Sequence, residues 1–201
     1  MDITDKFNKI EDIINLYEEL GKSDYIGEKI SQIEHALESA HFAEKKKEYL
    51  MNTYKLSDNE FNQFVLGCLL HDIGHLIGMK YDLTQMENVG ILRHENIGAE
   101  VLKKIGFGNI VCNVVLNHVN AKRYLCNIDK NYYSNLSDAS KITLKHQGGV
   151  MNEDEKNSFE KDHFKDLYIE MRRIDEESKV ENMVLPNLRD YVKMMEECLN
   201  I

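Results

Sequence analysis

The sequence predicts an all-α protein, and both its composition and its hydrophobic periodicity indicate this. Eleven glycines and one proline occur in 201 residues, roughly half of the ordinary usage of these turn-forming residues. Apolar side chains recur at steps of three and four along most of the chain, which is the period of an amphipathic helix. The length suits one domain that can bury a core without disulfides. We therefore expect residues 1–201 to form a single helical domain.

Helices are expected, in chain order, at residues 5–20, 30–53, 58–79, about 95–105, 109–125, 137–147 and 155–178, and after Pro186. Apolar side chains on one face mark the first two stretches: Phe7, Ile10, Ile13, Ile14 and Tyr17, then Ile30, Ile33, Leu37 and Ala40. Gly21 should end the first helix. The third stretch is more apolar, so it should be more deeply buried and should end near Gly78.

Turn signals separate the later stretches. Asn88 and Gly90 predict a loop over 82–90, and Gly148-Gly149 predicts a sharp break. The acidic run at 153–155 suits a helix start, because the helix dipole favours carboxylates there. Pro186 suits the first turn of the last helix. Segments 1–21 and 186–201 are therefore expected to be peripheral helices.

Charge argues against a nucleic-acid-binding protein. The formal net charge is −10, whereas proteins that bind nucleic acids usually present a basic face to the phosphates. A local basic pocket for one small anion is still compatible with that total. We expect a small molecule as the partner, with neither nucleic acid nor membrane. The sequence leaves the oligomeric state open.

The cysteines and the hydrophobic runs favour a cytoplasmic protein. Cys68, Cys112, Cys126 and Cys198 form no CxxC pair, so we expect reduced thiols, mainly in the core. The longest apolar run, residues 64–70, is far too short to span a bilayer. The first residues lack the basic and apolar regions of a signal peptide.

The histidines carry the functional signal. Five of the eight lie in or beside apolar helical stretches: His35, His71, His75, His94 and His118. Asp72 follows His71 in an apolar segment, and an aspartate is seldom buried without a partner or a metal. The sequence therefore predicts a metal site. The spacing of His71 and His75 is similar to the HExxH zinc-protease pattern, but Asp72 is shorter than glutamate and Gly74 interrupts the helix.

The pattern resembles the HD-domain superfamily, whose mark is a histidine, a His-Asp pair and a distal aspartate on one helical bundle. Members with two metals carry two further histidines. The resemblance implies an all-α HD-domain bundle with a dinuclear metal site in its core, held by His35, His71, Asp72, His94, His118 and Asp175. This mixed nitrogen and oxygen set suits iron or manganese. The absence of a thiolate from it weakens a structural zinc site.

Further residues resemble one branch of that superfamily, the mixed-valent di-iron oxygenases that cleave 1-hydroxyphosphonates. The match runs from Tyr25 to Asp175 and includes Tyr25, Glu28, His75, Lys122, Ser140, Gln147 and Arg172. It implies cleavage of the C–P bond of 2-amino- or 2-(trimethylammonio)-1-hydroxyethylphosphonate to glycine or glycine betaine and phosphate. The implied cofactor is a pair of irons, Fe(II) and Fe(III), bridged by Asp72, with dioxygen as co-substrate.

The same resemblance implies individual roles. Tyr25, Glu28 and His75 would be catalytic, the first two as a gate. Substrate would be held by Tyr25, Glu28, His75, Lys122, Ser140, Gln147 and Arg172. The chemistry is suitable, because a phosphonate dianion favours lysine and arginine. Glu28 would also face the ammonium group of the substrate, since a carboxylate suits an ammonium and the aromatic face of Tyr25 suits a quaternary one. Gly27 makes a loop at Tyr25–Glu28 the better expectation, and gates are commonly loops.

Other interpretations remain open at the sequence level. The chain could be an HD-type phosphohydrolase that acts on a nucleotide or phosphate ester with Mn²⁺, or a metal-dependent binding module. His75 could serve only to hold His71, and Lys122 could be a solvated charge. Ser140 could be helix surface and Gln147 part of a turn. His146 departs from the apolar residue usual beside Gln147 in the family, so it could alter the pocket wall or face solvent.

Overall fold

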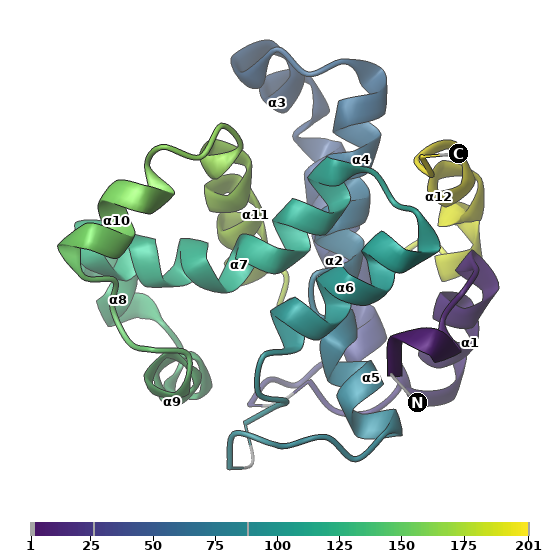
Figure 1. The fold of residues 1–201 in the computed structure, drawn as a ribbon, viewed down its shortest axis with the longest axis horizontal. Helices are drawn as coiled ribbons and strands as arrows, with labels where there is room; N and C mark the ends of the chain where they lie inside the picture. The colour runs from purple at the N-terminus through teal and green to yellow at the C-terminus, as the bar shows by residue number, and fades with distance from the viewer. Residues whose placement is uncertain (1–2, 26, 88, 201) are drawn as a thin grey trace.

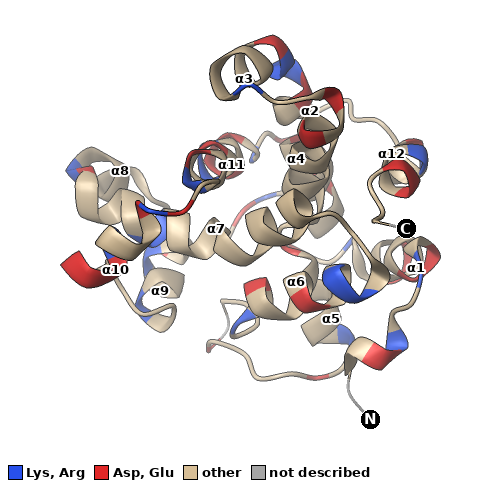
Figure 2. Cartoon of the chain, turned by 45° about the horizontal axis from the view of Figure 1, so that its top comes forward, with Lys and Arg blue, Asp and Glu red and all other residues tan. Residues whose placement is uncertain are grey.

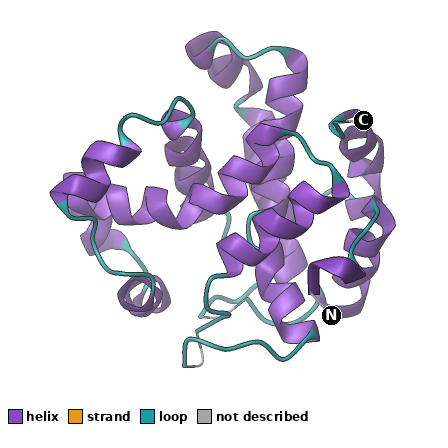
Figure 3. Ribbon diagram, in the orientation of Figure 1, coloured by secondary structure: helices purple, strands orange, loops and turns teal. Residues whose placement is uncertain are grey.

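Helices build the whole architecture of the computed structural model, which describes residues 3–25, 27–87 and 89–200 (Figure 3). No strand occurs among these residues. The N-terminal elements are η1 (Ile3–Lys6), α1 (Ile10–Leu20), α2 (Gln32–Lys45), α3 (Lys47–Tyr54), α4 (Asp58–Leu70) and α5 (Ile73–Lys80). The remaining elements are α6 (His94–Ile105), α7 (Asn109–Ile128), α8 (Lys130–Asn135), α9 (Asp138–His146), α10 (Glu153–Phe159), α11 (Lys165–Glu177), η2 (Leu188–Tyr191) and α12 (Val192–Glu197). The predicted all-α class is confirmed.

Helix α4 lies at the centre of the bundle (Figure 1). It packs against α2 and α7, while α7 also packs against α6 and α11, and α11 against α2. Phe64, Leu66, Leu69 and Leu70 on α4 are fully buried, as expected for the most apolar stretch. Burying side chains of this size supplies about 1.5–3 kcal/mol each, so α4 anchors the core.

Charged residues lie mainly on the outer helices. Figure 2 shows them on α1, α3 and α12, whereas α4 and most of α7 carry few. Helices α1 and α12 contact each other near the two termini, and α12 also packs against α4. Helices α8 and α9 follow the far end of α7 (Figure 1). The arrangement leaves the junction of α2, α4, α5, α6, α7 and α11 in the interior.

Three predicted helices are each two helices in the structure. The prediction joined each pair because the apolar period continues across the turn between them. The helix expected at 30–53 ends at Lys45, with Lys46 between α2 and α3. The helix expected at 58–79 turns at His71-Asp72, between α4 and α5. The helix expected at 155–178 is interrupted after Phe159, where Asp162 accepts a hydrogen bond from the Phe164 N–H at 2.8 Å. A side-chain acceptor of this kind competes with helical hydrogen bonding.

Other boundaries differ at caps. The first predicted stretch forms two elements, η1 and α1, with a break between them. Helix α8 was not expected. Its cap is Asp129, whose side chain accepts hydrogen bonds from the Asn131 and Tyr132 N–H groups. Pro186 lies before the cap Asn187 of η2 rather than in a first turn, so that prediction was wrong.

Several turn predictions are confirmed. Gly21 ends α1, and Gly148 and Gly149 both have positive φ, at 97° and 73°. Asn152 caps α10 ahead of the acidic run. The expected loop at 82–90 lies between α5 and α6, apart from Asn88, which is outside the described residues. The cysteines of the described chain are free thiols, three of them buried.

Candidate metal centre

Six helices or helix ends each contribute one side chain to a common interior point. His35 lies on α2 and His118 on α7, while His94 begins α6 and Asp175 lies on α11. His71 and Asp72 form the turn that separates α4 from α5. The histidines and Asp175 are buried, and the Asp72 side chain is 12% exposed. All six predicted metal ligands are therefore brought together.

Four of the histidines have the same orientation. Each directs Nδ1 at a backbone carbonyl: His35 at Ser178 (2.7 Å), His71 at Cys68 (2.8 Å), His94 at Ile91 (3.2 Å) and His118 at Val115 (2.7 Å). A carbonyl can only accept, so Nδ1 carries the proton and donates it. The neutral ring then has its lone pair on Nε2, which faces the interior. This is the usual arrangement for a histidine that ligates a metal through Nε2.

The inward nitrogens form two pairs. Nε2 of His35 lies 3.1 Å from Nε2 of His71, and Nε2 of His94 lies 3.0 Å from Nε2 of His118. Asp72 lies between the pairs. Its Oδ2 is 3.3 Å from His71 Nε2, while its Oδ1 is 3.3 Å and 3.4 Å from the Nε2 atoms of His94 and His118. One carboxylate thus faces two adjacent groups of donors, as a bridging ligand would.

The donor set fits two cations. Asp175 Oδ1 is buried and has no hydrogen-bond partner in the described chain, although it lies 3.4 Å from His35 Nε2. His35, His71 and Asp175 have ligand atoms close enough together to hold one ion. Lone pairs that face each other at such distances repel unless a proton or a metal lies between them. Imidazole and carboxylate donors of this kind suit iron or manganese.

Electrostatics also favour positive charge at this point. Burial opposes protonation of His71, yet Asp72 and Asp175 raise its pKa to about 9. Burial likewise opposes ionisation of Asp175, but the charge of Arg172 holds the pKa of that carboxyl well below its usual value. The centre therefore keeps its carboxylates ionised and attracts cations.

His75 differs from the four other histidines. Its Nε2 is 3.9 Å from Asp72 Oδ1, so distance alone would group it with Asp72 and His94 around an ion. However, the Ile91 N–H donates to His75 Nδ1 at 2.9 Å, which places the proton of the neutral ring on Nε2. Burial, and then the charge of His94, hold the pKa of His75 well below its usual value. His75 is therefore a neutral hydrogen-bond donor.

The structure also brings the predicted substrate residues together. A cavity of about 60 Å³ opens onto Asp72, His94, His118 and Asp175, and every predicted substrate residue lines it: Tyr25, Glu28, His75, Lys122, Ser140, Gln147 and Arg172. These residues come from the turn before α2, from α5, α7, α9 and from α11. The cavity is concave, largely buried and rich in convergent polar groups, as expected of a ligand site.

Three cationic side chains line this cavity, and Lys122 and Arg172 are the two that the sequence predicted. Lys122 is buried and donates to Thr143 Oγ1 at 3.0 Å, and burial, then the charge of Arg172, lower its pKa to about 7. Arg172 donates to Asp175, to Glu176 and, at 2.8 Å, to the Tyr132 hydroxyl. Arg172 therefore fixes the orientation of Asp175.

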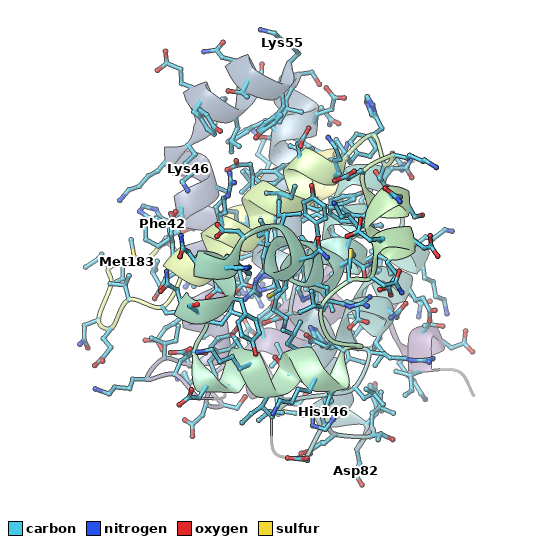
Figure 4. All side chains as sticks on the ribbon, turned by 90° about the vertical axis from the view of Figure 1, so that its left-hand side faces the viewer. Phe42, Lys46, Lys55, Asp82, His146 and Met183 are labelled. Carbon is cyan, nitrogen blue, oxygen red and sulfur yellow. The ribbon has the colours of Figure 1, made fainter. Side chains whose placement is uncertain are left out.

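Helix α9 forms one wall. Ser137 caps it by accepting from the Ser140 N–H at 3.2 Å, and Gln147 ends it. Gln147 Oε1 is buried and has no hydrogen-bond partner among the described residues. His146 instead pairs with Glu87 at 3.4 Å and lies at the outer edge of the molecule, near the loop that carries Asp82 (Figure 4). The departure at His146 thus lies outside the cavity wall.

The turn at Tyr25 covers the centre from another side. Gly27 has φ +82°, and the Glu28 N–H donates to the Tyr25 carbonyl, so the expected loop is confirmed over the described residues 25, 27 and 28. The Tyr25 ring stacks on His35, with centroids 3.9 Å apart. Burial, and then the charge of Asp72, raise the pKa of Tyr25 well above its usual value, so the phenol is neutral.

Sequence reasoning missed several polar residues of the wall, Thr143 and Lys179 among them. Thr143 is three residues after Ser140 and four before Gln147, so helical spacing places it on the same face. Lys179 is four residues after Asp175, but its spacing alone cannot distinguish it from a solvated lysine. Gln32 also lines the cavity from the first turn of α2.

Comparisons with known proteins agree with this geometry. The family model described as HD domain matches residues 32–200. An uncharacterized protein of Acanthamoeba polyphaga mimivirus is 38% identical over 95% of this chain and 82% of its own length. Hydroxymethylphosphonate dioxygenase of Gimesia maris is 34% identical over 95% of this chain and 88% of its own. The glycine-betaine-forming [1-hydroxy-2-(trimethylamino)ethyl]phosphonate dioxygenase of Leisingera caerulea is 32% identical over 96% and 91%.

One further structural finding concerns membranes. Within the described part of the chain, no helix has both the length and the apolar character needed to cross a bilayer.

Proposed function

The chain belongs to the HD domain family, and from that membership we propose that it is a metal-dependent dioxygenase that cleaves the C–P bond of a small 1-hydroxyphosphonate. Two relatives over nearly its whole length are named as phosphonate dioxygenases. The observation that carries the proposal is the position of the buried Lys122 and Arg172 beside the two donor groups that share Asp72. An anion bound by these cations would place its neighbouring carbon against the metals.

Iron is the metal we propose, as a mixed-valent Fe(II)/Fe(III) pair. His35, His71 and Asp175 would hold one iron with Asp72 Oδ2, and His94 and His118 would hold the other with Asp72 Oδ1. When bound, the pair would activate dioxygen, which supplies the oxidising equivalents for breaking the C–P bond. In balance, one dioxygen and one 1-hydroxyphosphonate give one carboxylic acid and one phosphate.

The side chains around the cavity have separate tasks in this proposal. Lys122 and Arg172 neutralise the phosphonate, and the Ser140 hydroxyl donates to one of its oxygens. Gln147 Oε1, which has no hydrogen-bond partner among the described residues, accepts from the 1-hydroxyl. His75 donates a hydrogen bond through Nε2. None of these groups needs to transfer the oxidising equivalents, so the protein's contribution is binding, orientation and exclusion of water.

Tyr25 and Glu28 act as the gate in this proposal. The Tyr25 ring lies over His35, so it shields the centre until substrate displaces it. The segment is a turn with Gly27 at φ +82°, and gates are commonly loops of this kind.

The test is oxygen uptake and phosphate release by the iron-loaded chain with hydroxymethylphosphonate and with 2-amino-1-hydroxyethylphosphonate, beside an anaerobic control. The proposal requires that phosphate forms only when dioxygen is present, and that the phosphate released equals the dioxygen consumed. Iron content and a mixed-valent electron paramagnetic resonance signal identify the cofactor. Anaerobic hydrolysis of a nucleotide or phosphate ester, with no oxygen uptake on either phosphonate, would instead make the centre that of a phosphohydrolase.

A further inference from the structure

Lys179 occupies the cavity wall next to the gate. It follows the end of α11, and its Nζ lies 3.2 Å from Glu28 Oε1 and 3.2 Å from Glu176 Oε2. The side chains of Lys179 and Glu28 are only 16% and 20% exposed, so solvent screens their pairing less than it would at the surface. Glu28 has no other ion-pair partner in the described chain.

This pair ends a series of alternating charges that begins at the metal centre. Asp175 pairs with Arg172, Arg172 with Glu176, Glu176 with Lys179, and Lys179 with Glu28. Each carboxylate in the series beyond the metal ligand is already neutralised by a cation of this chain. The carboxylate at the gate is therefore not left free to balance a positive charge on a substrate.

A cationic substrate would meet two obstacles here. Its ammonium group would have to share the Glu28 carboxylate with Lys179 or displace that side chain, and it would lie near the like charge of the Lys179 Nζ. A substrate without a cationic group leaves the pair intact and needs no rearrangement. The cavity of about 60 Å³ also suits a short molecule.

We propose that Lys179 is a specificity-determining residue: by neutralising Glu28 it makes the site prefer a 1-hydroxyphosphonate that carries no cationic substituent. This inference rests on the proposed function. It differs from the sequence-based expectation of an amino or trimethylammonio substrate, because that expectation assigned Glu28 to the ammonium group without a partner.

The experiment compares two substrates with the iron-loaded full chain. Values of kcat/KM and anaerobic dissociation constants are measured for hydroxymethylphosphonate and 2-amino-1-hydroxyethylphosphonate. For the wild type, kcat/KM should be about tenfold or more higher for hydroxymethylphosphonate, which carries no cationic substituent, because a cationic substrate meets a like charge at a partly desolvated site. Lys179→Met should reduce that preference about tenfold, mainly by improving the aminated substrate.

Two control variants separate the pairing with Glu28 from a general effect of charge. Lys29→Met removes the same charge from the same region, but its ion pair with Glu181 is largely exposed and lies outside the cavity. It should leave the preference unchanged. Adding Glu28→Gln to Lys179→Met should abolish the gain, because the gain requires a free carboxylate at Glu28.

The two claims can fail separately. If neither phosphonate is turned over, the proposed function is wrong, while the anaerobic dissociation constants still test Lys179. An unchanged ratio of those constants in Lys179→Met, or a wild type that prefers the aminated substrate, would overturn the inference. A gain that survives Glu28→Gln would overturn it as well, since Lys179 would then act by another route.

Discussion

Tyr25 stacks on His35 with ring centroids 3.9 Å apart and ring planes 18° apart. His35 faces the metal centre through Nε2, so the phenol ring covers the ligand shell on the side of the cavity. The contact joins a turn that precedes α2 to a residue inside α2. The cover and the ligand therefore belong to one segment of the chain.

Removing this cover should uncouple oxygen consumption from product formation. In Tyr25→Ala, we expect oxygen uptake in the absence of phosphonate to rise roughly tenfold, because water and dioxygen reach the centre without displacing a side chain. Tyr25→Phe keeps the stacked ring and should stay near the wild type. The measurements are oxygen uptake without phosphonate and, with phosphonate present, the ratio of oxygen consumed to phosphate released. Tight coupling in Tyr25→Ala would show that the ring is not a cover.

The approach of α5 to α6 should depend on Gly74. A Cβ at Gly74 would lie 1.9 Å from the His94 carbonyl oxygen, which is backbone and cannot rotate away. We expect Gly74→Ala to lower the free energy of unfolding by about 3 kcal/mol, and to displace His94. Gly149→Ala is the control, because its Cβ meets no described atom within 4 Å and only φ +73° opposes it. It should cost about 1–2 kcal/mol in denaturant titrations. Equal losses would argue against a steric cause at Gly74.

Metal binding should stabilise the fold measurably. If metal is present at about a hundredfold over its dissociation constant, it adds about 2.7 kcal/mol, which is about 5–10 °C in Tm for a chain of this size. We expect a chelator to lower Tm by that amount in the wild type. Asp72→Asn removes the carboxylate that both donor groups share, so its Tm should respond little to chelator and its iron content should fall below half. A chelator response equal to that of the wild type would exclude Asp72 as the bridge.

The sequence indicated the site better than it indicated the helix boundaries. His35 and Asp175 are far apart in the chain, yet the family resemblance placed both in one ligand set, and the structure puts their donor atoms 3.4 Å apart. Periodicity identified helical stretches correctly, but it could not reveal the turn at His71-Asp72, because apolar residues continue on both sides. That turn is what lets two adjacent residues face the same centre.

Long-range pairings were beyond the sequence for a physical reason. Lys179 and Glu28 are separated by most of the chain, and nothing in either local segment distinguishes a paired charge from a solvated one. Only the packing of α11 against α2 brings them within 3.2 Å. The orientation of His75 was equally hidden, since it depends on one backbone N–H from the loop before α6.

Substitutions of His75 and of His118 should affect the metal content differently. His75 Nδ1 accepts from the Ile91 N–H, whereas His118 Nδ1 donates to the Val115 carbonyl. The His75 ring also stacks on His94, with centroids 3.9 Å apart. We therefore expect His75→Phe, which keeps this stacking, to retain iron but to lose about a hundredfold in kcat/KM. His118→Phe should lose iron. Metal analysis after gel filtration decides between them, and iron loss in His75→Phe would make His75 a ligand.

The pKa of Lys122 predicts the alkaline limb of the pH profile. Burial lowers this pKa to about 7, so the side chain is charged below that pH and becomes neutral as the pH rises through it. Because the cation is proposed to hold the phosphonate, kcat/KM should fall above about pH 7, approaching a tenfold loss for each further unit. The profile of kcat/KM reports the free enzyme, in which substrate charge does not yet raise the lysine pKa.

The Lys122→Arg variant isolates this titration from that of the phosphonate itself. Arginine stays charged throughout the range, so the fall attributable to residue 122 should disappear. Any ionisation of the substrate remains in both profiles and cancels in their ratio. If the two profiles coincide, the alkaline limb belongs to another group, and Lys122 is then charged at neutral pH or does not contact the anion. If only the variant keeps its activity at high pH, Lys122 is the cation that holds the phosphonate.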